Sequence, residues 1–323
     1  MNYTAERQTI DGTEVVYLAD AKTRSEVWIA PSLGNNSYSM KVNGQPVFWS
    51  PVATLGELKA KPAMAGNPFL APWANRIDRD SYWANGKQFL LNPELKNYRY
   101  DGFHQPIHGL VVYASQWQVV SLSSGDESAS VTSRLEFWRY PEWMAQFPFA
   151  HTYEMTYRLR GGVLEIETSV ENLSTSPMPV SVAFHPYFTL PGVARDDWRI
   201  HVPVSRQVVL NEKLTPSGEL REFSLAQPVS LRDRQFDDVF TGLDMVKEFV
   251  VEGGGKKIAL RFGHKFPVAV VYAPKGRDFI CFEPMAGVTN HFNLEHEGKF
   301  GNLQHIVPGG RWRESYWIRT EGY

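Results

Sequence analysis

Apolar and polar residues alternate with a period of two along much of the chain, which is typical of β-strands with one buried face. The clearest example runs from His151 to Val170 and is interrupted by Gly161-Gly162. Two glycines between alternating runs predict a tight hairpin, because glycine readily takes the positive φ angles that such turns need. Comparable hairpins are predicted at Asn43-Gly44, at Asn85-Gly86 and at residues 253–255.

Shorter strands are expected at residues 14–18, 27–30 and 312–318, which are rich in branched and aromatic side chains. Helical signals are limited to residues 54–64 and 141–147, each enough for a turn or two. No repeat and no linker marks a domain boundary. The sequence therefore predicts an all-β protein, one domain over residues 1–323, built as a large antiparallel β-sandwich with few short helices.

The segment 180–190 combines a strand pattern with a candidate proton carrier. Residues 180–184 alternate apolar and small or polar side chains, which predicts a half-buried strand. Pairing should stop at His185-Pro186, because proline has no amide donor and disfavours helical geometry before it. His185 would then lie at a sheet rim, as a proton carrier near neutral pH or as a hydrogen-bonded structural histidine. Glu283 stands in a similar context, after a short apolar run and directly before Pro284.

Two segments before residue 114 contain further polar candidates. Arg76 lies in a stretch rich in proline and asparagine, either as a solvated arginine or as a donor to ligand oxygens, with Trp73 supplying an apolar surface. His104 and His108 have the spacing of a helical metal pair, but a proline separates them, so no metal site is expected. His108 is instead predicted to face a ligand where a loop enters a strand at residues 110–113.

Acidic and histidine-rich segments follow later in the chain. Asp237 and Asp238 are interpreted either as solvated loop residues or as acids that bind sugar hydroxyls through charge-assisted hydrogen bonds. The segment with His291, Glu295 and His296 is predicted to be a hydrophilic surface loop without a metal, because it lacks the helical HExxH spacing. Neither a phosphate-binding glycine motif nor a Gly-x-Ser-x-Gly nucleophile elbow is present.

Composition narrows the functional classes. Of the 323 residues 43% are hydrophobic, enough for a large core, and the net charge of -2 argues against a nucleic-acid partner. The single cysteine, Cys281, excludes an intrachain disulfide and fits a reducing compartment. The sequence contains no run of about 18 apolar residues, so no membrane span is predicted. A cytoplasmic location is predicted, with a periplasmic or secreted one after signal removal left open.

Five motifs appear in the order found in one protein family. They are NPFLAPWANRI, IHGL, AFHPYF, FDDVF and FEPMAGVTN, and they extend from Asn67 to Asn290. In these motifs the chain resembles the aldose 1-epimerase (galactose mutarotase) family. The resemblance implies that family's supersandwich and the interconversion of the α and β anomers of a hexopyranose.

The same resemblance implies roles for single residues. Glu283 matches the general base for the anomeric hydroxyl and His185 the general acid for the ring oxygen. Arg76 and His108 match substrate-holding residues, and Asp237 matches an acid that binds sugar hydroxyls. An ionised Glu283 and a protonated His185, facing each other across the sugar, are then expected. No cofactor or metal is required, the partner is a small sugar, and the chain is expected to be a monomer or homodimer.

Departures from the family pattern leave the substrate open. Asp238 stands where galactose mutarotases commonly have a histidine, and Thr189 where they frequently have an asparagine. The resemblance therefore does not imply a preference for galactose, and it leaves the role of Asp238 open. Some family members act on hexose 6-phosphates, for which Arg79, Lys87 and Arg99 are candidate cations.

Two alternatives from other classes remain. One is a non-catalytic sugar-binding protein on the same fold, since a fold alone does not give an activity. The other is a glycoside hydrolase or lyase that uses Glu283 with Asp237 as its carboxylate pair.

Overall fold

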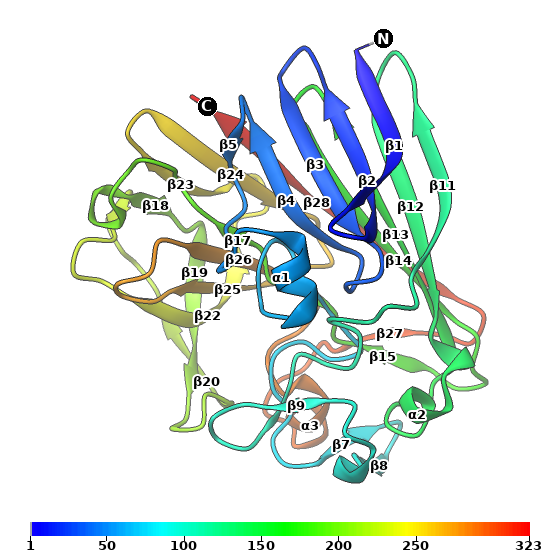
Figure 1. Ribbon diagram of the computed structural model, residues 1–323. Helices are drawn as coiled ribbons and strands as arrows, with labels where there is room; N and C mark the ends of the chain where they lie inside the picture. Colours follow the sequence, from blue (N-terminus) through cyan, green and yellow to red (C-terminus); the bar gives the residue numbers. More distant parts are fainter. Residues whose placement is uncertain (1) are drawn as a thin grey trace.

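The computed structural model describes residues 2–323, which form three large antiparallel sheets arranged in two layers (Figure 1). A nine-stranded sheet forms one layer, and a five-stranded and an eight-stranded sheet lie side by side in the other. Ring contacts such as Phe184–Tyr316 and Phe249–Phe282 join the eight-stranded sheet to the nine-stranded one. The largest cluster of buried apolar side chains fills the space between the layers.

Each large sheet contains strands from distant parts of the chain. The nine-stranded sheet has the order β11 (Gln118–Ser124), β12 (Ala129–Glu136), β13 (His151–Arg160), β14 (Val163–Asn172), β28 (Arg311–Glu321), β24 (Lys256–Phe262), β23 (Phe249–Gly253), β18 (Arg199–His201) and β21 (Val229–Ser230). The eight-stranded sheet has the order β20 (Pro216–Glu222), β19 (Val204–Leu210), β22 (Phe236–Leu243), β25 (Val268–Ala273), β26 (Ile280–Met285), β16 (Ala183–Phe184) and β6 (Phe69–Leu70), with β17 (Tyr187–Phe188) also paired to β26. The five-stranded sheet contains β1 (Tyr3–Ile10), β2 (Thr13–Asp20), β3 (Ser25–Ala30), β4 (Asn36–Val42) and β5 (Gln45–Pro46).

Small elements connect these sheets. Three two-stranded sheets pair β7 (Ser81–Ala84) with β8 (Lys87–Leu90), β9 (Arg99–Tyr100) with β10 (Pro106–Ile107), and β15 (Met178–Val180) with β27 (Gln304–Ile306). The helices are short: α1 (Leu55–Ala60), α2 (Pro141–Met144), α3 (His291–His296) and the 3₁₀ turns Pro93–Leu95, Phe137–Arg139 and Arg195–Asp197. The all-β class with few short helices is confirmed.

The predicted hairpins are confirmed, and the glycines explain them. Gly161-Gly162 connects β13 to β14, Asn43-Gly44 connects β4 to β5, and Asn85-Gly86 connects β7 to β8. All six residues have positive φ, as type I′ turns require. Gly254-Gly255 turns β23 into β24 in the same way. The expected helix at residues 54–64 is shorter, spanning Leu55–Ala60 behind a capping box between Thr54 and Glu57.

Three sequence expectations about local structure were wrong. Residues 180–184 do not form one half-buried strand, because the chain is buried on both faces there and divides into β15 and β16. Residues 110–113 form turns rather than a strand. The segment 291–296 is the helix α3, whose first four side chains are buried, and not a surface loop. In segments 180–184 and 291–296, polar side chains concealed how deeply the chain is packed.

One structural finding concerns membranes. Within residues 2–323 no helix has the length and apolar character needed to cross a bilayer.

Candidate active site

Antiparallel pairing brings His185 and Glu283 together. Strand β26 pairs with β16 through Ala183–Met285 and with β17 through Tyr187–Cys281. His185 lies midway between these two pairs on its side and Glu283 midway on the other, so the register places them opposite each other. Directly opposed residues of an antiparallel pair point to the same sheet face with Cβ atoms about 5 Å apart. The Nε2 atom of His185 is accordingly 3.2 Å from Oε1 of Glu283.

The same sheet face supplies the next residues of the site. Val270 on β25 pairs with Glu283, and Tyr272, two residues further, pairs with Asp237 on β22. Because side chains two residues apart share a face, these residues project to the side on which His185 and Glu283 lie. Asp237 therefore comes from a strand, which is at odds with one of its two interpretations, that of a loop residue.

Loops that cross this face contribute Arg76 and His108. An isolated antiparallel bridge joins Arg76 to Ile107, and the amide of His108 donates to the carbonyl of Asn75. His108 has φ of 64°, and Gly109 after it has φ of 65°. A Cβ atom on Gly109 would lie 2.1 Å from the carbonyl oxygen of Ala71, so only glycine fits at this crossing.

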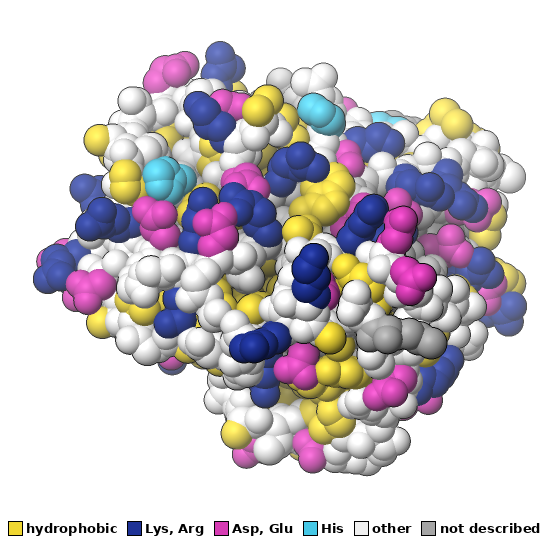
Figure 2. All heavy atoms as spheres, turned by 90° about the horizontal axis from the view of Figure 1, so that it is seen from above, with side chains coloured by type: hydrophobic (Ala, Val, Ile, Leu, Met, Phe, Trp, Pro, Cys, Tyr) yellow, Lys and Arg dark blue, Asp and Glu magenta, His cyan; other side chains and the backbone are white. Residues whose placement is uncertain are grey.

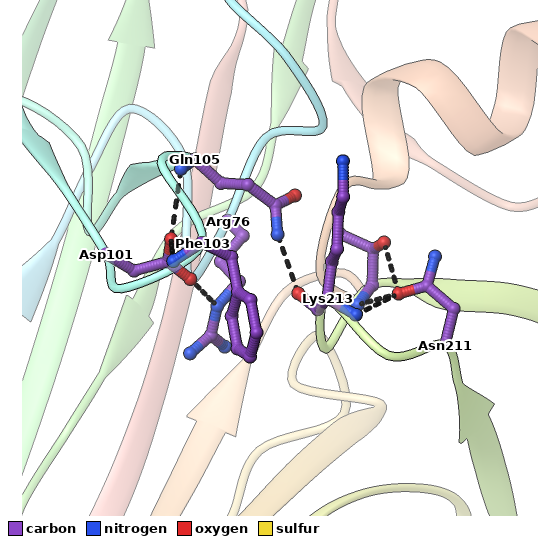
Figure 3. A network of polar contacts seen from close by, with 7 residues as sticks. Arg76, Asp101, Phe103, Gln105, Asn211 and Lys213 are labelled. Carbon is purple, nitrogen blue, oxygen red and sulfur yellow. Dashed lines mark hydrogen bonds and ion pairs between the residues drawn. The ribbon is translucent and has the colours of Figure 1, made fainter.

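A buried acid holds the guanidinium of Arg76 (Figure 3). Nε of Arg76 donates to Oδ2 of Asp101 at 2.6 Å, while Oδ1 of Asp101 accepts from the amides of Phe103 and Gln105. Burial alone would raise the pKa of Asp101, but these hydrogen bonds outweigh it and the pKa lies below its usual value. Gln105 in turn donates to the carbonyl of Lys213, which ties this loop to the β19–β20 turn.

Asn290 anchors the other side of the Arg76 loop. Its amide donates to the carbonyl of Arg76, and its side-chain oxygen accepts from the amide of Asp78. The residue has φ of 61°, a left-handed conformation that asparagine tolerates better than most residues. The Thr-Asn end of the FEPMAGVTN motif thus has a positioning role that the sequence did not reveal.

All five residues singled out by the sequence line one cavity of about 180 Å³. These are Arg76, His108, His185, Asp237 and Glu283, joined by Asn75, Ile107, Tyr187, Val270 and Tyr272. The volume is below the roughly 300–1,000 Å³ of sites for drug-sized ligands, so it suits one small ring.

Three buried polar atoms of residues that line this cavity have no hydrogen-bond partner within residues 2–323. They are Nδ1 of His108, Nδ1 of His185 and Oε2 of Glu283. Buried polar atoms are nearly always paired, so three unpaired atoms on residues around one small cavity are an unusual concentration.

Burial disfavours charge on both members of the central pair. It raises the pKa of Glu283 well above its usual value, an effect that the charge of Asp237 increases and that of Arg76 opposes. It also lowers the pKa of His185 to about 3, helped by the positive charges of Arg76 and Arg99. Burial thus favours a neutral imidazole beside a carboxylic acid in the sugar-free protein. The imidazolium beside a carboxylate that the sequence led us to expect concerns the sugar complex and stays a prediction.

Several other sequence candidates lie outside the cavity. Trp73 is buried in the core against Tyr98 rather than lining the site. His104 stacks on Tyr100, and His296 stacks on Trp83. Within residues 2–323 no cluster of three or more His, Cys, Asp or Glu side chains is arranged to hold a metal ion.

The whole sequence can be compared with models of known protein families. The family model for aldose 1-epimerase matches residues 18–319, nearly the whole chain. The chain belongs to the aldose 1-epimerase family. The resemblance carried by the five motifs is thereby confirmed.

Several solved structures share the fold of this aldose 1-epimerase family member. A galactose mutarotase-like protein from Clostridium acetobutylicum superposes with a TM-score of 0.87 at 19% identity, covering 100% of this chain and 99% of that one. A galactose 1-epimerase from Lactobacillus acidophilus NCFM gives a TM-score of 0.77 at 14% identity, again over 100% and 99%. Among curated proteins, Escherichia coli YihR, described as uncharacterized, is 23% identical over 69% of this chain and 70% of its own.

Sequence reasoning missed two aromatic residues of the site. The ring of Tyr187 stacks on that of His185 with centroids 4.7 Å apart, and Tyr272 meets His185 edge-on at 6.1 Å. Tyr187 could have been found from its spacing, because it is two residues after His185. Tyr272 could not, because only the β22–β25 register brings it next to Asp237.

The buried carboxyl group predicts how stability depends on pH. Unfolded Glu283 ionises above its ordinary pKa of 4.5, whereas the folded group keeps its proton to higher pH. The unfolded state is thus favoured as the pH rises, and Glu283→Gln removes this penalty. The variant should be more stable than the wild type by at least about 1 kcal/mol at pH 8, with a smaller gain at pH 5, in urea denaturation.

Glu248→Gln is the matched control with the opposite sign. Oε2 of Glu248 lies 2.6 Å from Nη2 of Arg319, and this ion pair lowers the pKa of Glu248. Its replacement should lower stability at pH 8. If Glu283→Gln also destabilises the protein more at pH 8 than at pH 5, Glu283 is held as a carboxylate and our assignment is wrong.

Proposed function

We propose that the protein is an aldose 1-epimerase that interconverts the α and β anomers of a hexopyranose through acid/base ring opening. The observation that carries the proposal is the 3.2 Å contact between Nε2 of His185 and Oε1 of Glu283 inside a cavity of about 180 Å³. The two oxygens that exchange protons in mutarotation, the anomeric hydroxyl and the ring oxygen, are attached to the same carbon. A base and an acid that touch each other can therefore serve both.

The protonation state of the pair fits this chemistry. A neutral imidazole and a carboxylic acid share one transferable proton. Moving that proton from Glu283 to His185 across their contact gives a carboxylate and an imidazolium. The charge of Arg76 favours the carboxylate, and sugar hydroxyls would give it hydrogen bonds that also favour ionisation. The pair can thus provide one base and one acid without drawing a proton from solvent.

Ring opening then uses each group once. Glu283 removes the proton of the anomeric hydroxyl as His185 protonates the ring oxygen, and the bond between C1 and that oxygen breaks to leave an open-chain aldehyde. Rotation about C1–C2 exposes the other carbonyl face. On closure the ring oxygen returns its proton to His185, and Glu283 returns its proton to the new anomeric oxygen. Both residues end as they began, and no other bond is broken.

The remaining polar residues would hold the ring. Burial, helped by the charges of Arg99 and Arg76, lowers the pKa of His108 well below its usual value, so it is neutral and can donate from its ring to a sugar oxygen. Arg76, fixed by Asp101, offers guanidinium donors on the same side. Asp237 at the exposed margin would accept from hydroxyls. Asp238 instead bonds Gln207, so we assign it no contact with the sugar.

Substituting the proton carriers tests the proposal. His185→Asn and Glu283→Gln should each lower kcat/KM by at least about a hundredfold, since positioned acid–base groups contribute on the order of 10²–10⁴-fold. The assay is polarimetry on freshly dissolved α-D-glucose and α-D-galactose, with the buffer rate subtracted.

A second His–Glu pair provides the matched control. Nε2 of His201 lies 3.6 Å from Oε1 of Glu252, outside the cavity, and His201→Asn and Glu252→Gln should leave the rate unchanged. Wild-type protein that binds sugar but leaves the optical rotation at the buffer rate would show a non-catalytic binding protein. Variants of the cavity pair with full activity would refute the assigned roles.

The buried pair also predicts the pH profile. Activity falls on the acid side when His185 takes a second proton, and its pKa is lowered to about 3. The profile of kcat/KM should therefore stay flat from pH 7 to pH 5, instead of falling by half near 6.5 as for an exposed histidine. Unfolding midpoints at the same pH values control for denaturation. A half-loss between pH 6 and pH 7 would contradict the neutral-imidazole assignment.

One observation favours a phosphorylated sugar as a second candidate substrate. Of the three cations considered from the sequence, Arg79 is 79% exposed beside Asp78 and Lys87 is exposed, whereas Arg99 is half-buried. Arg99 lies over the ring of Tyr113 at 4.9 Å, and its Nε has no partner within residues 2–323.

The surroundings of Arg99 suit an anion. It lines a hollow of about 290 Å³ together with Lys96 and no acidic residue, and its charge reaches His108 and His185. A sugar phosphate could place its anionic group against this guanidinium while its ring lies in the cavity.

Comparing kcat/KM for glucose 6-phosphate with kcat/KM for glucose decides between a phosphorylated and a free sugar as the substrate. A phosphate preference predicts that Arg99→Met lowers kcat/KM for glucose 6-phosphate by about tenfold or more and spares glucose, since a lost charge-assisted hydrogen bond costs about 1.5–3 kcal/mol. Arg79→Met is the control and should change neither. Equal effects of Arg99→Met on both sugars would exclude phosphate recognition there. A cytoplasmic location remains our prediction from the sequence.

A further inference from the structure

The guanidinium of Arg76 has a choice of three acids. Asp237 and Glu283 line the cavity together with Arg76, whose charge opposes the rise in pKa that burial causes in each of these acids. Asp101 is the third acid and does not line the cavity. Among residues 2–323, only Asp101 has a carboxylate oxygen within 4 Å of the Arg76 guanidinium. Arg76 is therefore paired with the one acid of the three that lies outside the ligand space.

The contact with Asp101 uses one edge of the guanidinium (Figure 3). Nε of Arg76 donates to Oδ2 of Asp101 at 2.6 Å, and the two side chains are only 14% and 7% exposed. Neither Nη atom of Arg76 donates to another group within the described residues 2–323. A guanidinium has five N–H donors in a fixed plane, so four remain for a ligand once Nε is used.

Asp101 is itself fixed by its own loop. Its Oδ1 accepts from the amides of Phe103 and Gln105, and its backbone amide donates to the carbonyl of Gln105. The side chain of Gln105 donates to the carbonyl of Lys213 at 2.6 Å, in the turn between β19 and β20 (Figure 3). The acid that holds Arg76 is thus supported from two separate segments of the chain.

We infer that Asp101 is a positioning residue of the reaction, which holds Arg76 away from Glu283 and Asp237 and keeps both Nη atoms free for sugar oxygens. The inference rests on the proposed function and adds to it a residue outside the cavity. Arginine pairs readily with carboxylates, so a released guanidinium can turn to either acid of the cavity. Paired with Glu283 it would occupy the group that takes the anomeric proton, and paired with Asp237 it would compete with the sugar hydroxyls.

Asp101→Asn separates the contact with Arg76 from the support of the loop. An asparagine side chain has one acceptor oxygen and one NH₂ donor group. If its oxygen keeps the amides of Phe103 and Gln105, its NH₂ group faces Nε of Arg76, and two donors cannot bond each other. The reverse orientation would give up two hydrogen bonds to keep one. The variant should therefore keep the loop and release the guanidinium.

A double-mutant cycle tests whether Asp101 acts through Arg76. Mutarotation of glucose and galactose is measured by polarimetry for the wild type, Asp101→Asn, Arg76→Met and the double variant. Asp101→Asn alone should lower kcat/KM by about tenfold to a hundredfold, as expected for a misplaced binding group. In the Arg76→Met background the same change should alter kcat/KM by less than about twofold. Equal losses in both backgrounds, or full activity of Asp101→Asn, would overturn the inference.

Asp244→Asn is the matched control. Asp244 also accepts from the amide two residues further on, that of Val246, and pairs with a cation, Lys247, but it lies outside the cavity. Its replacement should leave kcat/KM unchanged in both backgrounds. Midpoints of urea denaturation show whether each variant is folded in the assay.

A second variant decides if Asp101→Asn does not fold. Lysine has a single nitrogen, so it cannot bond Asp101 at one edge and offer planar donors at the other. Arg76→Lys should therefore lose about as much kcat/KM as Arg76→Met. Wild-type activity of Arg76→Lys would show that a charge alone is enough and would overturn the inference.

Failure of the positioning role can be distinguished from failure of the proposed function. If the wild type turns over sugar and the cycle shows no coupling, the positioning role is refuted and the function stands. If the wild type binds sugar without turnover, or Arg76→Met is too slow to assay, calorimetric dissociation constants for glucose and galactose enter the same cycle. Coupling there supports the role of Asp101, and its absence refutes that role. A wild type that neither binds nor turns over sugar would refute both.

Discussion

The antiparallel pairing of β26 with the broken strand β16–β17 is the constraint on which the site depends. His185 and Glu283, the two candidate proton carriers, are far apart in the chain but become direct cross-strand neighbours because the pairs on either side of them fix the register. A slip of one residue would turn one side chain to the other sheet face. Pro186 and Pro284 stand directly after His185 and Glu283. Each lacks an amide donor, which explains why the ladder is interrupted there while the flanking pairs hold the register.

Burial around this pair determines its chemistry. Burial of the pair raises the pKa of Glu283 and lowers that of His185 to about 3, which favours the uncharged form of each before a ligand arrives. In this environment a bound sugar and Arg76 have a large influence on where the shared proton lies, since few other polar groups compete. Arg76 is itself fixed at two points: its guanidinium donates to Asp101, and its backbone carbonyl accepts from the amide of Asn290.

Much of this arrangement could be predicted from the sequence, and the failures have physical causes. The hairpins were predictable because Gly161-Gly162 and the Asn-Gly pairs give local signals. The five site residues were predictable from motifs, although alternation alone could not decide whether segment 180–184 was half-buried or fully buried. Helix α3 was missed because its charged and polar letters conceal four buried positions. The roles of Tyr272 and Asp101 depend on long-range register and loop contacts, which leave no local pattern.

On the face shown in Figure 2, basic and acidic side chains are interspersed, and no continuous area of one sign forms. The candidate recognition elements are instead concave: the small cavity that holds His185 and Glu283, and the acid-free hollow beside Arg99.

A crystal structure of the protein with a bound aldohexose tests the central claim most directly. The account predicts that the ring occupies the cavity between Arg76, His108 and Asp237. Its anomeric oxygen should then lie within about 3 Å of the Glu283 carboxyl group, and its ring oxygen at a similar distance from the His185 imidazole. A sugar bound with its anomeric carbon away from both groups would contradict the account.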